Sequence, residues 1–353
     1  MENKKKEPTV PWMMMMFFLV LYYSISLTIG NPPKVFELDI DTGSDLTWVQ
    51  CDAPCTGCTK TIDHLYKSQK HILFSCDHPS CSVVHFPESP RCEKPDDQCD
   101  FEINYFDHGS VLGVVVYDVF SLRFMNGSLA RLRLTFGGVL GLSYGKASLL
   151  SQLQSFDLTR NIIGHCLSGK GGGFLFIGDD LVPSKMSWMP VLANSKNYLS
   201  SPAEVLYDGK PTGIKDLKLI FDSGSSYTYF NFRVYEVVLD LVSKERLKWE
   251  DKALPICWKG TKPFKSVHDV KNYFSTLTLS FTDTPTVQLE LQPEAYLIVT
   301  EDGNACFGIL NGTEAGLGDL YIIGDISMID KMVVYDNEKQ RIGWISADCD
   351  RLP

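Results

Sequence analysis

The chain has few basic clusters and no nucleotide-binding or serine-hydrolase motif, and each absence excludes a class of function. Its only tight basic run is Lys4–Lys6, and no stripe of Lys and Arg interleaved with aromatic residues suggests nucleic acid as a partner. The Gly-rich run at 169–173 lacks the Gly-Lys-Ser/Thr ending of a phosphate loop, so a hairpin turn is expected there. No Gly-x-Ser-x-Gly elbow occurs, which leaves serine hydrolase chemistry without support.

Helical periodicity is also scarce, which favours a fold built from strands. Only Leu149 to Leu153 and Val234 to Val242, the latter including Val237, place apolar residues at helical spacing, and both stretches are predicted to be short helices packed on sheets. The chain has 353 residues, of which 44% are hydrophobic, and its net charge is -10. This length exceeds the usual size of one domain, so two lobes are expected.

Two phrases of the same kind occur in the two halves of the chain, each where a strand-like run ends. Residues 41–44 read Asp-Thr-Gly-Ser and follow the alternating run 35–40, while residues 222–225 read Asp-Ser-Gly-Ser and follow the apolar run 217–221. A Gly-containing turn after a strand can present a side chain into a cleft. An isolated Asp-X-Gly would be interpreted as an Asx turn that merely ends the strand.

A second element is repeated downstream of each phrase. Residues 139–142 read Val-Leu-Gly-Leu, and residues 322–325 read Ile-Ile-Gly-Asp. An Asp turn followed by an apolar strand that ends in Gly, occurring twice, describes an internally duplicated domain.

The two aspartates suit the hydrolysis of amides. Two carboxylates in hydrogen-bond contact cannot both ionise easily, so Asp41 and Asp222 would share one proton. One partner is then a base toward a water and the other an acid toward a carbonyl oxygen. The hydroxyls of Ser44 and Ser225 are expected to hydrogen-bond the outer carboxylate oxygens.

These motifs resemble those of the pepsin-type aspartic proteases, and among them the plant nucellin-like branch. The matching words are DTGSDLTW at 41–48, CDAPC at 51–55, YFDHGS at 105–110, FDSGSS at 221–226 and IGD at 323–325, and the resemblance covers the chain from about Tyr22 onward. It implies an all-β, bilobal pepsin-like fold with a few short helices. The lobes would span residues 24–190 and 191–353, with an extended peptide bound between them under a β-hairpin flap.

The resemblance also assigns roles to individual residues. Asp41 and Asp222 are the catalytic pair, and the flap is predicted over 101–117. Tyr105 matches the flap tyrosine, whose hydroxyl would hydrogen-bond the indole N–H of Trp48; an ordinary cross-strand aromatic and a core filler are the alternatives. The remaining expected site residues orient the pair or shape the flap, and they are Thr42, Gly43, Ser44, Ser223, Gly224, Ser225 and Gly109.

Eleven cysteines favour the secretory route. Seven of them fall in a Cys-rich insertion at 51–99. Cys55-x-x-Cys58 has the spacing of a zinc site, but disulfides are favoured because Asn126 and Asn311 begin glycosylation sequons, which are used only in a secreted chain. The resemblance implies that disulfides staple the insertion, and Cys257 with Cys306 is a candidate bridge. The candidate bridging cysteines are Cys51, Cys55, Cys58, Cys76, Cys81, Cys92, Cys99, Cys257, Cys306 and Cys349.

The N-terminus fits export. Residues 1–23 have the charged and apolar regions of a signal peptide; a membrane anchor is less favoured because the apolar stretch is short and leads into residues 24–29, the expected first strand. Membrane contact is expected only through an uncleaved N-terminal segment, and the destination is the extracellular space, the apoplast or the vacuole. No prosegment has room between the apolar stretch and the first lobe.

One departure from the family concerns residues 136–139. Phe136-Gly137 runs directly into Gly138-Val139, whereas relatives place a Cys-containing loop and an Asp between these words. The first lobe is therefore predicted to be shortened, and the lost Cys is predicted to be the partner of Cys166. A displacement of Asp41 by about 1 Å would be enough to impair catalysis.

The sequence thus predicts a monomeric aspartic endopeptidase that cleaves protein or peptide substrates at acidic pH, without metal or cofactor. The alternative is a catalytically silent relative that binds proteins with the same cleft. Both Asp turns and Tyr105 favour the enzyme, and the shortened lobe favours silence. A zinc-binding regulatory module at 51–99 is a third hypothesis.

Overall fold

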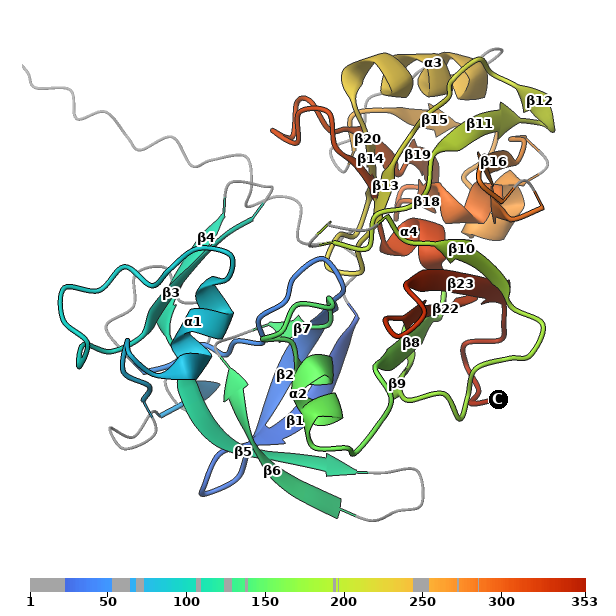
Figure 1. Ribbon diagram of the computed structural model, residues 1–353. Coiled ribbons are helices and arrows are strands. Elements are labelled where there is room, and N and C mark those ends of the chain that lie inside the picture. Colours follow the sequence, from blue (N-terminus) through green and yellow to red (C-terminus); the bar gives the residue numbers. More distant parts are fainter. Residues whose placement is uncertain are drawn as a thin grey trace, which may run out of the picture.

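The computed structural model describes residues 23–52, 64–67, 73–105, 109–123, 129–136, 139–192, 195, 197–243, 254–271, 273–284 and 286–353. Within these ranges the first and last parts of the chain form two β-rich lobes that lie side by side (Figure 1). Helices are few and short, so the predicted all-β, bilobal class is confirmed. No helix in the described part of the chain has the length and apolar character needed to span a membrane.

The first lobe is built on one five-stranded sheet in the order β6-β5-β1-β2-β7. In β2 the alternating side chains Phe36, Leu38 and Ile40 are buried, as the sequence period predicts. The short helix α2 (Leu149–Ser155) buries its leucines in the same core. The strands are β1 (Ser24–Ile29), β2 (Lys34–Asp41), β5 (Val116–Arg123), β6 (Leu129–Phe136) and β7 (Leu140–Gly141).

The apolar-Gly element of the first lobe lies beside the Asp41 strand. Strand β7 pairs in parallel with β2, with Leu140 opposite Ile40 and Gly141 opposite Asp41. Residues 137 and 138 lie outside the described ranges. The predicted displacement of Asp41 is therefore not seen in the strand register.

A hairpin and a disulfide-rich segment complete this lobe. Strands β3 (Asp100–Asn104) and β4 (Ser110–Val114) pair antiparallel, and Tyr105 N–H donates to the carbonyl of Gly109 at 2.8 Å. Helix α1 (Pro79–His85) lies in the insertion. The disulfides Cys76–Cys92 and Cys81–Cys99 confirm that the insertion is stapled; Cys51 is unbridged among the described residues, and Cys55 and Cys58 lie outside them.

The described residues of the second lobe form three small sheets. Helix α3 (Phe232–Ser243) buries Val234, Val238 and Val242, whereas Val237, also expected in the core, is 42% exposed. The predicted Cys257–Cys306 bridge joins two strands of one sheet. The sheets are β12-β11-β16-β17, β13-β21-β14-β20 and β15-β19-β18, with strands β11 (Ala203–Tyr207), β12 (Lys210–Pro211), β13 (Leu219–Phe221), β14 (Thr228–Phe230), β15 (Cys257–Lys259), β16 (Leu277–Phe281), β17 (Gln288–Leu291), β18 (Leu297–Val299), β19 (Asn304–Phe307), β20 (Ile309–Asn311) and β21 (Tyr321–Ile323), and short helices η4 (Val267–Val270), η5 (Pro293–Ala295) and α4 (Asp325–Met328).

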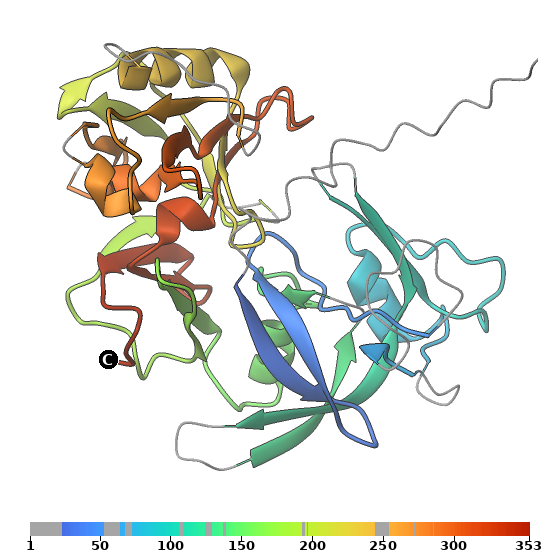
Figure 2. The same ribbon diagram turned by 180° about the vertical axis from the view of Figure 1, so that it is seen from behind.

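A five-stranded sheet shared by distant parts of the chain connects the two lobes. Its order is β10-β23-β22-β8-β9, and from behind the red C-terminal strands lie against the green ones (Figure 2). The Gly-rich run 169–173 forms the predicted turn between β8 and β9, with Gly171 and Gly172 at positive φ. The strands are β8 (Ile162–Leu167), β9 (Gly173–Ile177), β10 (Ser187–Pro190), β22 (Lys331–Asp336) and β23 (Arg341–Ser346).

The prediction that Cys166 has lost its partner is wrong. Cys166 on β8 is bridged to Cys349, which follows β23. The two cysteines are 183 residues apart. The bridge therefore fixes the C-terminus to the sheet between the lobes.

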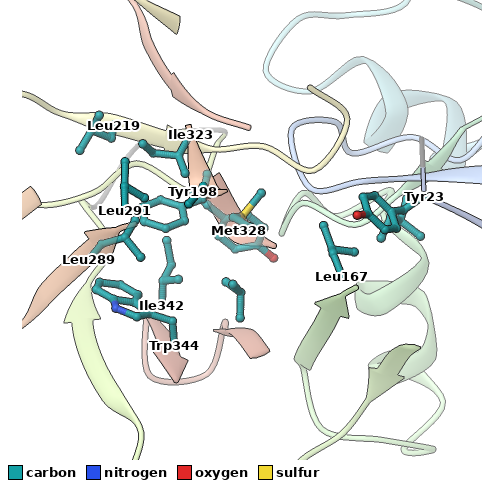
Figure 3. Packing of buried hydrophobic residues seen from close by; sticks show 14 of the residues in the cluster. Tyr23, Leu167, Tyr198, Leu219, Leu289, Leu291, Ile323, Met328, Ile342 and Trp344 are labelled. Atoms are coloured by element: carbon teal, nitrogen blue, oxygen red, sulfur yellow. The ribbon is translucent and has the colours of Figure 1, made fainter. Parts of the chain in front are cut away.

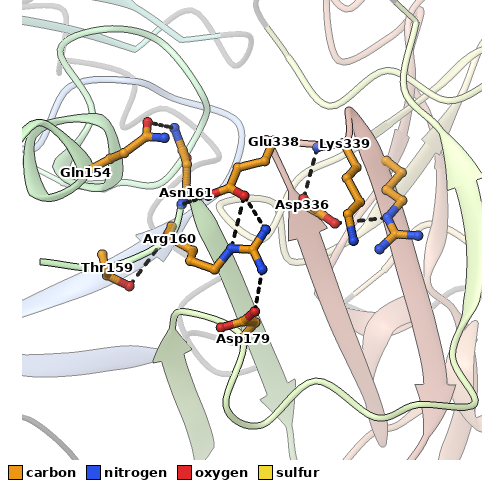
Figure 4. Close-up of polar contacts among 9 residues, drawn as sticks. Gln154, Thr159, Arg160, Asn161, Asp179, Asp336, Glu338 and Lys339 are labelled. Atoms are coloured by element: carbon orange, nitrogen blue, oxygen red, sulfur yellow. Dashed lines mark hydrogen bonds and ion pairs between the residues drawn. The ribbon is translucent and has the colours of Figure 1, made fainter. Parts of the chain in front are cut away.

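Both apolar and polar contacts hold this junction. The main hydrophobic cluster is continuous, running from Trp344 and Tyr198 past Met328 to Leu167 and Tyr23 (Figure 3). At the surface, Arg160 bonds Asp179 at 2.7 Å and Glu338 through two guanidinium nitrogens (Figure 4).

Candidate active site

Asp41 and Asp222 stand at corresponding ends of two strands, and the structure brings them together. Asp41 ends β2, and Asp222 follows β13, which pairs in parallel with β21. The two carboxylates are within hydrogen-bond reach of each other. A Cβ atom added at Gly43 would lie 2.5 Å from Oδ1 of Asp222, and one at Gly224 would lie 2.6 Å from the carboxyl carbon of Asp41. Only glycine therefore fits at either turn.

Hydrogen bonds to the two carboxylates are unequal. Gly43 N–H donates to Oδ1 of Asp41 at 2.8 Å, and Gly224 N–H donates to Oδ1 of Asp222 at 2.9 Å. Ser44 also donates its hydroxyl to Oδ2 of Asp41, as predicted. Ser225 does not repeat this contact, because its hydroxyl donates to the carbonyl of Tyr227 at 3.1 Å. The role expected for Ser225 is thus corrected.

Thr42 and Ser223 lock the two turns to each other. Thr42 N–H donates to Oγ of Ser223 at 3.1 Å, and Ser223 N–H donates to Oγ1 of Thr42 at 2.9 Å. Each hydroxyl then donates across the lobe boundary, Thr42 to the carbonyl of Phe221 and Ser223 to that of Ile40. Because all four bonds cross between the lobes and are buried, they fix the distance between the aspartates.

The surroundings of the pair keep it from ionising fully. Burial raises the pKa of Asp41, and hydrogen bonds from Ser44 and Gly43 oppose this rise. Burial raises the pKa of Asp222 well above its ordinary value, and the charge of Asp41 raises it further. The hydroxyl of Ser44 therefore favours ionisation of Asp41 over that of Asp222.

A third buried carboxyl, Asp325, lies close enough to feel the pair. It is 2% exposed, and its Oδ1 has no hydrogen-bond partner among the described residues. Burial raises its pKa well above the ordinary value, and the charges of Asp222 and Asp41 raise it further. From the sequence, Asp325 was recognised only as part of the Ile-Gly-Asp motif. The second copy of the repeat has Asp325 where the first copy has Leu142, and this difference could have identified the residue.

A tyrosine and a histidine lie beneath the Thr42–Ser223 lock. The hydroxyl of Tyr335 is 3.4 Å from Oγ1 of Thr42 and 3.3 Å from Nε2 of His165. Burial lowers the pKa of His165 to about 3, so the ring stays neutral under all but strongly acidic conditions. Sequence reasoning missed this pair because β8 and β22 are neighbours only in the folded chain.

The flap hydrogen bond expected from the resemblance is present. Trp48 Nε1 donates to the hydroxyl of Tyr105 at 2.6 Å. Tyr105 follows β3 and Gly109 precedes β4, while residues 106–108 at the tip lie outside the described ranges. The exposed Leu112 lies on the second strand of this hairpin.

Only one of the two sequons lies in the described part of the chain. Asn126 lies outside the described residues. Asn311 is 9% exposed on β20, and its Oδ1 accepts a hydrogen bond from Thr313 N–H at 3.1 Å. Its burial in the folded chain argues against the glycosylation predicted there.

Comparisons with known proteins agree with this geometry. Residues 23–179 match the family described as "Xylanase inhibitor N-terminal", and residues 198–346 match "Xylanase inhibitor C-terminal". An aspartic proteinase of Oryza sativa subsp. japonica is 39% identical over 94% of this chain and 89% of its own length. "Aspartic proteinase 36" of Arabidopsis thaliana is 26% identical over 93% of this chain and 74% of its own length.

Solved structures show the same fold at low identity. The crystal structure of edgp has a TM-score of 0.72 at 16% identity and covers 94% of this chain and 92% of its own. That of basic 7S globulin from soybean has a TM-score of 0.71 at 16% identity, with 92% and 93% covered.

Proposed function

The chain belongs to the plant pepsin-type aspartic protease family, and on this premise we propose that it is an aspartic endopeptidase acting at acidic pH. The observation that carries the proposal is the contact between the buried carboxyl groups of Asp41 and Asp222, held by reciprocal hydrogen bonds through Thr42 and Ser223. Relatives that are named aspartic proteinases support the same conclusion.

The proposed reaction uses the two carboxyl groups in different states. Asp41, ionised, takes a proton from a water molecule placed between the pair, and the oxygen attacks the peptide carbonyl carbon. Asp222 donates its proton to the carbonyl oxygen. Collapse of the resulting tetrahedral diol returns a proton to the departing nitrogen, which breaks the C–N bond and leaves a new carboxyl and a new amine.

The pKa values of the two carboxyl groups set the limits of the proposed working range in pH. The shared proton is kept to a higher pH than an ordinary Asp would allow, because Asp222 has its pKa raised by burial and by the charge of Asp41. The rate falls as the pH rises through this raised pKa, since the general acid is then lost. It falls again in stronger acid, where Asp41 is protonated and no base remains.

Substrates are proposed to be extended segments of proteins or peptides that lie under the flap at Tyr105, cleaved by a monomer. A secretory destination, outside the cell or in the vacuole, is supported by four disulfides among the described residues.

A silent, protein-binding homologue is the second candidate. Two observations favour it: the matched families are described as xylanase inhibitors, and Ser225 gives Asp222 no hydroxyl donor. Both candidates share the fold and the site, so only chemistry separates them.

Cleavage of a denatured protein at acidic pH tests the proposal. The wild-type chain should cleave it, pepstatin should block cleavage, and Asp222→Asn should reduce the rate by about 10²- to 10⁴-fold or more because the general acid is lost. Asp240→Asn, on the exposed face of α3, is the control and should retain the wild-type rate. A folded wild-type preparation without activity would favour the silent homologue.

A further inference from the structure

One cluster outside the active site combines two sulfur atoms and an imidazole. Cys81, Cys99 and His85 each offer a ligand atom, and these three atoms lie within 4.8 Å of one another. Cys81 and His85 are one turn apart on α1, so their side chains share a face of the helix. Both cysteines are buried, whereas His85 is partly exposed and connects the cluster to solvent.

The hydrogen bond of His85 fixes which ring nitrogen is free. Nε2 lies 2.8 Å from the backbone carbonyl of Asp100. Because a carbonyl only accepts, Nε2 carries the proton and Nδ1 has the lone pair. Metal-binding histidines are oriented in the same way, by donating the other N–H to a carbonyl or carboxylate.

In the oxidised chain the two sulfur atoms are joined as a disulfide and cannot both bind a metal. A dithiol reductant changes this: the protein S–S bond breaks, two protein thiols form, and the dithiol becomes a cyclic disulfide. A divalent metal then displaces both thiol protons to solvent. Two thiolates and one imidazole suit zinc and similar soft ions in a tetrahedral site whose fourth position holds solvent.

The position of Cys99 connects this cluster to the flap. Cys99 directly precedes β3, donates its N–H to the carbonyl of Phe74 and accepts from the N–H of Val115. It also packs in one cluster with Phe101 and Leu46. The disulfide between Cys99 and Cys81 of α1 therefore anchors the base of the flap hairpin, and a metal bound to both sulfur atoms would anchor it in the same way.

We propose that Cys81, Cys99 and His85 form a latent, redox-controlled zinc-class site, closed as a disulfide and opened by reduction, in which the metal replaces the disulfide as the anchor of the flap. The inference is independent of whether the chain is a protease, since the site and its readouts do not involve Asp41 or Asp222.

The test uses the full chain, reduced with a dithiol that is then removed, with and without Zn²⁺. Thiols are alkylated and mapped by peptide mass spectrometry. Zn²⁺ should protect Cys81 and Cys99 from alkylation but leave the neighbouring pair Cys76 and Cys92 reactive. In His85→Gln, about 10- to 100-fold more Zn²⁺ should be needed for the same protection. Removing a residue that only orients a metal ligand has an effect of this size, so it is the least expected when a ligand itself is lost.

The matched control is His78→Asn, which removes the other imidazole of the helix while keeping a good N-cap. Hydrogen exchange of residues 100–104 gives a second readout, since Zn²⁺ should restore the protection that reduction removes. Three results would overturn the proposal: equal protection in His85→Gln, no protection of Cys81 and Cys99 in the wild-type chain, or a Cys81–Cys99 bridge that is reduced only when the whole chain unfolds.

Discussion

The buried His165 should make the folded chain less stable in acid, and replacing it should remove this effect. His165 lies on β8 beneath the active site, and its Nε2 atom lies 3.3 Å from the hydroxyl of Tyr335. Burial lowers its pKa from 6.5 to about 3. In His165→Gln the side-chain amide can still form a hydrogen bond with the hydroxyl of Tyr335, so the contact is kept while the titrating group is lost.

The folded chain loses stability in acid because the unfolded chain takes up a proton at His165 more readily. The unfolded chain binds a proton at His165 as the pH falls through 6.5, and the folded chain does not until about pH 3. Stability contributed by the neutral ring is therefore full above pH 6.5 and is lost between pH 6.5 and 3. By linkage the loss between pH 8 and pH 5 is about 2 kcal/mol, and it reaches about 5 kcal/mol below pH 3.

Urea unfolding at pH 8 and at pH 5 measures this difference. The carboxylates titrate in both proteins, so their contribution cancels when the pH dependence of wild type and His165→Gln is compared. The wild type should lose about 2 kcal/mol more than the variant over this interval. His64→Gln, at an exposed position, should behave like the wild type. An equal loss in wild type and His165→Gln would show that His165 is not held neutral and would refute the reasoning.

Three further changes test the site. Gly224→Ala should abolish cleavage, because the new Cβ atom would lie 2.6 Å from the carboxyl carbon of Asp41; circular dichroism should show a folded chain, and wild-type activity would contradict the packing. Thr42→Val should lower the free energy of unfolding by about 1–3 kcal/mol by leaving Ser223 N–H without its acceptor, while Thr42→Ser should be close to wild type in denaturant titrations. Trp48→Phe should lower kcat/KM about tenfold, because it removes the donor to Tyr105 and the net free energy of one hydrogen bond corresponds to a factor of this size. An unchanged kcat/KM would show that this hydrogen bond does not contribute to catalysis.

Sequence reasoning predicted the features that depend on local pattern or on repetition. The alternation at 35–40 specified strand β2, and helical spacing specified α2 and α3. The Asp turn occurs in both halves of a duplicated domain, and this repetition predicted that Asp41 faces Asp222. The conformation of the loops was not needed for this prediction. The hydroxyls at Thr42 and Ser223 were recognised as part of the site, but their exchange of bonds between the lobes was not.

Features that depend on distant packing or on a single torsion angle were missed. The partner of Cys166 lies 183 residues away, and only the sheet between the lobes brings the two sulfur atoms together. Ser225 has the same sequence context as Ser44, yet its hydroxyl is directed to the carbonyl of Tyr227. Asn311 has the letters of a sequon, but strand pairing within the second lobe buries it.

The most direct test of the central claim is the pH dependence of kcat/KM for cleavage of a denatured protein. A pair that shares one proton should give a bell-shaped profile, with the rate falling as the pH drops through the pKa of Asp41 and falling again as the pH rises through the higher pKa of Asp222. A well-folded chain that cleaves nothing at any pH, or a profile that stays flat through this range, would contradict the account.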